Sequence, residues 1–148
     1  AGFIADIHAQ AFGRFVPDAE VVAVASPTPG KAAKFAGVRG IPRAFEDYRE
    51  LLKVDEIDMV TIGIPNDLHC RVTLEAAKAG KHVVCEKPLC RTLEEADRMI
   101  EACRRTGMKA AICHQTRYSP RLKVVRQIIA RTVPSVTSAA RSGESFSS

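Results

Sequence analysis

Short apolar runs and longer amphipathic stretches alternate along the chain. The apolar runs predict strands at residues 20–26, 57–64, 82–85 and 109–113, with a shorter edge strand at 42–45. Polar residues or prolines follow the four longer runs, which is typical of strands that end at a turn. The β-branched apolar run at 20–26 suits a strand that is buried on both faces of a parallel sheet.

The amphipathic stretches predict helices at residues 31–36, 47–53, 67–79, 92–107 and 120–131. Thr28 is expected to cap the first of these helices, and Thr92 with Glu95 three residues later forms a capping box. Gly80 and Gly107 stand where a glycine is expected, just beyond a helix C-terminus. Four apolar residues of the last helix are expected to face inward: Leu122, Val125, Ile128 and Ile129.

The alternation of strands and helices with short turns predicts an α/β fold with a doubly wound parallel sheet. Parallel neighbours need crossover connections, and helices are the favoured crossovers. We assign residues 1–131 to this domain and expect the serine-rich end, 132–148, to be the start of another domain or a disordered tail. In such sheets ligands bind beyond the carboxyl ends of the strands, so the polar residues there carry the question of function.

Composition narrows the class of protein. The 148 residues, 46% of them hydrophobic, fit one globular domain, and no apolar run approaches the roughly 18 residues that span a bilayer. The net charge of +5 arises from basic residues spread among acidic ones, so no nucleic-acid partner is expected.

Five cysteines without a Cys-x-x-Cys pair, and no secretion signal, predict reduced thiols and a cytoplasmic location. Histidines and cysteines show no metal-ligand spacing, so no metal site is predicted.

The first motif at a strand end is Gly2-Phe3-Ile4-Ala5. It has the form of the last part of Gly-x-Gly-x-x-Ala, a turn in which backbone amides approach a pyrophosphate at a helix N-terminus. The first glycine of the full motif would precede Ala1. The strand at 20–26 ends about 24 residues later, close to the place of the residue that reads the adenosine ribose.

At that reading position the chain has Ser26 and Thr28, with Lys31 nearby, and no acidic residue. An acidic residue would accept both ribose hydroxyls and repel a 2′-phosphate, whereas hydroxyl groups beside a lysine tolerate that phosphate. The sequence therefore favours NADP over NAD. An alternative is that Ser26 and Thr28 only cap the following helix.

Three further polar motifs follow predicted strands. Pro65-Asn66 with His69 can hydrogen-bond a ribose or a nicotinamide, or form an Asx turn with a surface histidine. Glu86-Lys87-Pro88 ends a buried strand with a charged pair, which suits a lysine in a cleft that donates to a substrate oxygen or transfers protons. The alternative there is a surface ion pair before a proline turn. The segment 114–120, which contains Arg117, is either part of the site or a plain loop.

Together these motifs resemble the glucose–fructose oxidoreductase and inositol dehydrogenase family, often called Gfo/Idh/MocA. The most specific part is Gly-Lys-His-Val-Val-Cys-Glu-Lys-Pro-Leu at 80–89, supported by Ile-Pro-Asn-Asp-Leu-His at 64–69 and Arg-Tyr-Ser-Pro at 117–120. The resemblance extends from Ala1 to about Arg131. It implies a Rossmann-like domain that binds NAD or NADP, in an oxidoreductase acting on a hydroxyl or carbonyl group of a sugar or cyclitol.

The resemblance also implies roles for individual residues. Gly2 to Ala5 would line the pyrophosphate, Ser26 and Thr28 the adenosine ribose, and Pro65, Asn66 and His69 the middle of the cofactor. Glu86 and Lys87 would lie beside the nicotinamide, where Lys87 holds the reacting oxygen and assists proton transfer. Arg117 would approach the nicotinamide side, and the Lys87–Pro88 peptide bond is a candidate for the cis form.

Relative to the family, we expect this chain to be cut short at both ends. It would lack the first, central strand, which leaves an open slot in the sheet, and the C-terminal α+β domain that supplies the substrate pocket. The parent enzyme is expected to be a homo-oligomer and to transfer hydride. The chain itself could bind the dinucleotide without turnover, or be an inactive partial gene product.

Overall fold

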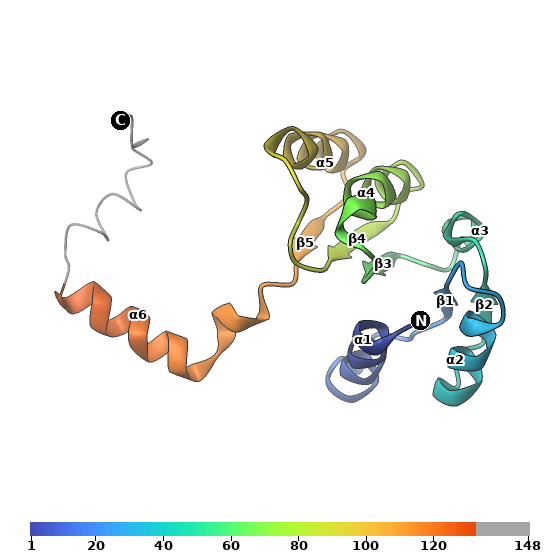
Figure 1. Cartoon of the computed structure of the whole chain (residues 1–148), viewed down its shortest axis with the longest axis horizontal. Coiled ribbons are helices and arrows are strands. Elements are labelled where there is room, and N and C mark those ends of the chain that lie inside the picture. Colours follow the sequence, from blue (N-terminus) through green and yellow to red (C-terminus); the bar gives the residue numbers. More distant parts are fainter. Residues whose placement is uncertain (133–148) are drawn as a thin grey trace. The chain divides into compact units, whose positions relative to one another are not determined.

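The computed structural model describes residues 1–132 as helices alternating with short strands (Figure 1). In chain order the elements are α1 (Phe3–Phe15), β1 (Ala23–Ala25), α2 (Lys31–Arg39), β2 (Arg43–Phe45), α3 (Tyr48–Leu52), β3 (Met59–Ile62), η1 (Asn66–Leu68), α4 (His69–Lys78), β4 (His82–Cys85), α5 (Leu93–Thr106), β5 (Ala110–Ile112), η2 (Gln115–Tyr118) and α6 (Pro120–Thr132). They fall into two compact units, Ala1–Cys113 and a second one that begins at His114. Apart from Thr132, the expectation for 132–148 lies outside the described residues.

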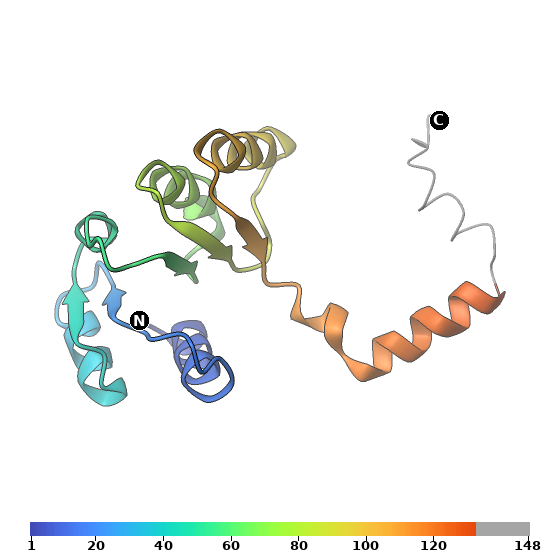
Figure 2. The same ribbon diagram turned by 180° about the vertical axis from the view of Figure 1, so that it is seen from behind.

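The strands of the first unit form two parallel sheets instead of one. One sheet has the order β1-β2, and the other has the order β3-β4-β5, as Figure 2 shows from behind. Every described pair is parallel, with Val24 opposite Ala44 and Val83 between Val60 and Ala110. The α/β class with parallel sheets is confirmed. Within residues 1–132, β1 and β3 do not pair with each other, as expected for an open slot between them.

A cavity of about 980 Å³ lies along the strands β1 and β3, each of which has one unpaired edge. Its lining is mainly apolar and includes Ala5 and Phe12 of α1, Val24 of β1, and Val60 and Ile62 of β3. Met59 of β3 lines this cavity and is 38% exposed. The reason is that no neighbouring strand covers this edge in the described part of the chain.

Two hydrophobic clusters hold the first unit together. The larger one lies between the β3-β4-β5 sheet and helices α4 and α5, and includes Ile62, Val72, Ala76, Val83 and Met99. The smaller one packs Val24 of β1 against α2 and the turn after it; its other buried members are Ala32, Ala36 and Ile41. Each sheet thus has its own core, because nothing in the described residues bridges the slot with a strand.

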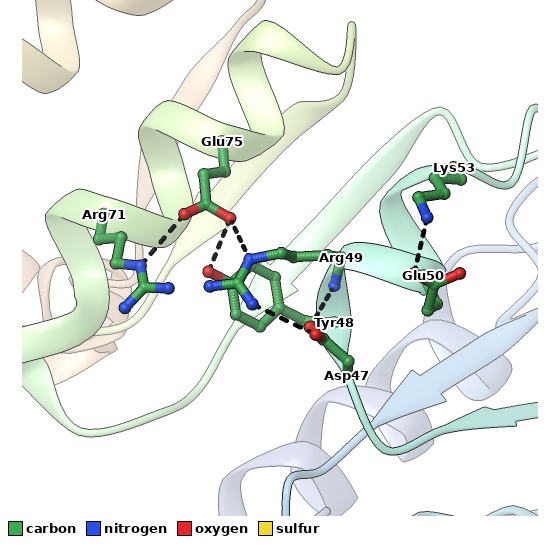
Figure 3. A network of polar contacts seen from close by, with 7 residues as sticks. All are labelled: Asp47, Tyr48, Arg49, Glu50, Lys53, Arg71 and Glu75. Atoms are coloured by element: carbon green, nitrogen blue, oxygen red, sulfur yellow. Dashed lines mark hydrogen bonds and ion pairs between the residues drawn. The ribbon is translucent and has the colours of Figure 1, made fainter.

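A polar network links α3, which contacts the β1-β2 sheet, to α4, which contacts the β3-β4-β5 sheet (Figure 3). Glu75 of α4 accepts a hydrogen bond of 2.7 Å from the Tyr48 hydroxyl and forms ion pairs with Arg49 and Arg71. Burial and the bond to Glu75 raise the pKa of Tyr48 to about 12, so the hydroxyl remains a donor at neutral pH. Asp47 caps α3 by accepting from the amide of Arg49.

Several element ends differ from the prediction. The sequence predicted only the start of helix α1, and the structure shows that this helix extends to Phe15. Helix α2 continues through Gly37 to Arg39 and ends at Gly40, which adopts a left-handed conformation. Four residues of α6 that were expected to face inward are exposed: Leu122, Val125, Ile128 and Ile129. No helix within residues 1–132 combines the length and apolarity needed to cross a membrane.

The two threonines predicted as helix caps behave differently. The Thr92 hydroxyl accepts from the amide of Glu95 at 3.2 Å, which confirms the N-cap half of the box, while the Glu95 carboxylate accepts from the amide of Arg91 instead of that of Thr92. The prediction that Thr28 caps α2 is wrong. The N-cap residue of α2 is Gly30, and no side chain caps that helix. A short, proline-bounded turn places the Thr28 backbone carbonyl, not its hydroxyl, opposite the amide of Lys31.

This difference gives a matched pair of variants. We predict that Thr92→Ala lowers the free energy of unfolding by about 1 kcal/mol, because one amide at the start of α5 loses its acceptor. Thr28→Ala should change the same quantity by less than about 0.5 kcal/mol, since an exposed side chain without a cap contact is removed. Urea denaturation of both variants measures the difference, and equal effects would contradict the assignment.

Candidate functional site

The N-terminus of α1 presents free backbone donors. Gly2 is the N-cap residue, and no side chain caps the helix; the first helical bond runs from the amide of Asp6 to the Gly2 carbonyl. The amides of Phe3, Ile4 and Ala5 accordingly have no acceptor within the described residues. These donors and the partial positive charge of the helix end suit an anion such as a phosphate.

No atom of the described protein requires glycine at position 2. Gly2 has an extended backbone (φ −156°), and a Cβ built on it would meet nothing within 4 Å. Space at this position is therefore free for a ligand that approaches the backbone closely.

The first turn of α1 lies against the carboxyl end of β3. A Cβ at Gly63, the residue after β3, would stand 2.9 Å from the Ile4 side chain, so only glycine fits there without a shift. On the other side, Ala1 packs against the cluster formed by Val24 of β1 and Ala32 of α2. The helix N-terminus thus lies between the segment after β1 and the end of β3, where the sequence placed the pyrophosphate.

The residues expected to read the ribose follow β1. Ser26 is buried and its amide donates to the carbonyl of Phe45, whereas Thr28 and Lys31 are exposed. The carboxylate of Glu46, which follows β2, accepts a hydrogen bond of 3.1 Å from the amide of Gly30. Of the three predicted residues, the two with exposed side chains are free to meet a ribose or its phosphate.

His69 was expected to contact the middle of the cofactor, but its side chain is buried between two loops. Its side chain is 1% exposed, and its two ring nitrogens lie 2.9 Å from the Ile64 carbonyl and 2.8 Å from the Pro88 carbonyl. Each ring nitrogen thus lies within hydrogen-bond distance of a carbonyl oxygen, and the tautomer decides which nitrogen donates. His69 therefore ties the loop after β3 to the loop after β4, and no ring nitrogen is left for a ligand. Pro65 and Asn66, on the first of these loops, are exposed.

The Glu86-Lys87-Pro88 segment ends β4 with one buried and one exposed charge. Glu86 is 6% exposed; its carboxylate accepts from the amide of Lys87 at 3.1 Å and lies 3.1 Å from Nε2 of His8. Burial raises the pKa of Glu86, but these hydrogen bonds and the nearby His8 and Lys87 charges lower it, with a net result below its usual value. The carboxylate is therefore ionised at neutral pH.

Lys87 is exposed, and its ammonium makes no hydrogen bond or ion pair within residues 1–132. The peptide bond to Pro88 is cis, which confirms the expectation from the sequence. A cation beside an ionised carboxylate at the carboxyl end of a parallel strand can hold a substrate oxygen and exchange a proton with it. Arg117, the remaining predicted residue, is exposed in η2 of the second unit.

His8 is the residue of this site that the sequence prediction missed. It lies in the middle of α1, 78 positions before Glu86. The signal was indirect: a carboxylate that ends a buried strand needs donors, and a histidine one and a half turns into the helix that faces the strand ends can supply one.

Comparison with known proteins agrees with this geometry. Residues 1–114 match the Gfo/Idh/MocA family model, described as an oxidoreductase family with an NAD-binding Rossmann fold. The uncharacterized oxidoreductase ORF334 of Rhizobium meliloti is 40% identical over 111 residues, which cover 75% of this chain and 33% of that protein. The 1,5-anhydro-D-fructose reductase of Ensifer adhaerens is 37% identical over 111 residues, with the same coverage.

Among solved structures, the WlbA dehydrogenase from Bordetella pertussis, in complex with NADH and UDP-GlcNAcA, has a TM-score of 0.82 at 28% identity. The similarity covers 88% of this chain and 39% of that one. The chain thus spans about a third of the length of the curated relatives it matches.

Proposed function

The chain belongs to the Gfo/Idh/MocA oxidoreductase family, and on that basis we propose that it is the nicotinamide-binding part of a hydride-transferring enzyme. The enzyme would oxidise a hydroxyl of a sugar or cyclitol, or reduce the corresponding carbonyl. One relative is named a 1,5-anhydro-D-fructose reductase, and a structural neighbour, the WlbA dehydrogenase, was crystallised with UDP-GlcNAcA; both names support this substrate class. The dinucleotide would supply the hydride chemistry, and the protein would position the dinucleotide against the substrate.

The observation that carries the proposal is the uncapped N-terminus of α1 beside the end of β3. Free amides of Phe3, Ile4 and Ala5 offer donors to the pyrophosphate, and the open space at Gly2 lets the phosphates approach the backbone. Pro65 and Asn66, exposed on the loop after β3, would meet the middle of the cofactor, and His69 would act by holding that loop.

At the adenosine end, Ser26, Thr28 and Lys31 would meet the ribose. The absence of an acidic side chain among them, and the exposed cation of Lys31, favour NADP over NAD.

At the nicotinamide end, Lys87 would hold the reacting oxygen and move its proton, Glu86 would lie beside it, and Arg117 would approach the same side. The free ammonium of Lys87 favours this enzymatic role over a module that only binds the dinucleotide, because binding alone has no use for it. We further propose that an apolar strand fills the slot between β1 and β3, and that the enzyme is a cytoplasmic homo-oligomer.

Substitution at Gly2 tests the pyrophosphate site. We predict that Gly2→Asp stabilises the chain slightly, because a carboxylate at the N-cap accepts from the free amides and favours the helix dipole. The same carboxylate occupies the donors and repels phosphate, so the affinity for NADH, followed by nicotinamide fluorescence, should fall at least about tenfold, or 1.4 kcal/mol.

Gly2→Asn is the matched control, since it caps the helix equally well without the charge. It should lower the affinity less than Gly2→Asp does. The contrary result is that both variants melt at or above the melting temperature of the original chain and bind NADH as tightly as the original chain. That result would show that the pyrophosphate does not lie at this helix.

A further inference from the structure

Three side chains from distant parts of the first unit converge at the carboxyl ends of β4 and β5. His8 comes from α1, Glu86 follows β4, and Cys113 follows β5. Nε2 of His8 lies 3.1 Å from Oε1 of Glu86 and 4.0 Å from Sγ of Cys113. All three ligand atoms lie within 4.8 Å of one another, and it is the one such group among residues 1–132.

These atoms are of the three kinds that proteins use for zinc: an imidazole nitrogen, a carboxylate oxygen and a cysteine sulfur. With the usual bond lengths and tetrahedral angles, such atoms stand about 3.3–3.7 Å apart around one ion. The separations of 3.1 and 4.0 Å from Nε2 of His8 lie within about 0.3 Å of that range, and the third separation is at most 4.8 Å.

The surroundings of the three atoms favour a cation. Glu86 is nearly buried and ionised, and hydrogen bonds to His8 and to its neighbour's amide hold its carboxylate in place. Cys113 is a free thiol that is partly buried. A cysteine binds a metal ion as the thiolate, so binding of the ion would release the thiol proton of Cys113.

We propose that His8, Glu86 and Cys113 form a binding site for one thiophilic divalent cation, best fitted by Zn²⁺. Three protein ligands leave a fourth position for water or another donor. The ion would tie α1 to the ends of β4 and β5. A search for ligand spacing along the sequence misses this site, because its members are separated by 78 and 27 positions. Glu86 is also the residue that we place beside the nicotinamide, but metal binding by the group is measured without a dinucleotide.

The test is titration of the purified, reduced chain with ZnCl₂ by calorimetry, and with CoCl₂ by absorption spectroscopy. We expect saturable binding of one ion per chain and, with cobalt, the charge-transfer band of a cobalt–thiolate bond. Cys113→Ser keeps the size and polarity of the side chain, so the fold is retained. It should abolish the charge-transfer band and weaken Zn²⁺ binding by at least about tenfold.

Two further variants separate this site from other thiols. His8→Asn should weaken Zn²⁺ binding by at least about tenfold as well, whereas Cys90→Ser, which alters a thiol outside the group, should leave it within about twofold. The proposal is overturned if folded chain, checked by circular dichroism, shows no saturable binding. It is also overturned if Cys113→Ser binds as tightly as the original chain, or if only Cys90→Ser loses the metal.

Discussion

Replacement of His69 by alanine is expected to lower the free energy of unfolding by about 3 kcal/mol, the largest stability effect we predict for a single residue. The side chain is almost fully buried, so its removal leaves a cavity. It also removes the ring nitrogens that lie within hydrogen-bond distance of the Ile64 and Pro88 carbonyls. Thermal unfolding should show a melting temperature lower by about 10 °C.

Two variants separate the causes of this loss. His69→Phe keeps a ring in the space but removes both ring nitrogens, so most of the destabilisation should remain. His114→Ala removes an exposed histidine of the second unit and should change the unfolding free energy by less than about 0.5 kcal/mol. Recovery of the original stability in His69→Phe would show that packing, and not the two hydrogen bonds, holds the loops.

Replacement of Lys87 by alanine is expected to have the largest effect on activity. In the hydride-transferring enzyme that we propose, the turnover number should fall by about 10²–10⁴-fold, because the group that holds the reacting oxygen and moves its proton is lost. The dissociation constant for the dinucleotide should change little, since no hydrogen bond of the described chain involves the Lys87 ammonium. Initial-rate kinetics and fluorescence titration measure the two quantities separately.

Lys109→Ala is the matched control for this variant. Lys109 is also exposed, but it precedes β5 and so lies at the amino end of its strand. Its replacement should leave both turnover and dinucleotide affinity within about twofold, as for other surface changes. A Lys87→Ala enzyme with unchanged turnover would remove Lys87 from the reaction and leave the nicotinamide end without its proposed proton carrier.

Local signals in the sequence predicted much of the fold. The cap at Thr92, the glycines beyond α4 and α5 and the parallel strands depend on neighbouring residues or on turn chemistry, whereas the cis bond at Lys87–Pro88 was predicted from the resemblance to the family. Thr28 and α6 were predicted by the same rules and failed. Whether a hydroxyl turns to the amides, or an apolar helix face meets another element, depends on packing that is not local.

The site was predicted in its strand-end positions but not in its contacts. His69 was correctly placed after β3, yet its burial depends on the Pro88 carbonyl, 19 residues later, which no local pattern reveals. The pairing of His8 with Glu86 depends on how α1 lies on the strand ends. The slot between β1 and β3 could be anticipated only from the resemblance to a family, because the strands themselves carry no sign of an unpaired edge.

The most direct test of dinucleotide binding is a titration of the purified chain with NADH and with NADPH, followed by nicotinamide fluorescence. A second version should carry an added apolar strand and a glycine before Ala1, designed to fill the slot. We predict saturable binding that is strongest in the extended version, with NADPH bound more tightly than NADH. Absence of binding to either dinucleotide in both versions, when each melts cooperatively, would contradict the assignment of a nicotinamide cofactor.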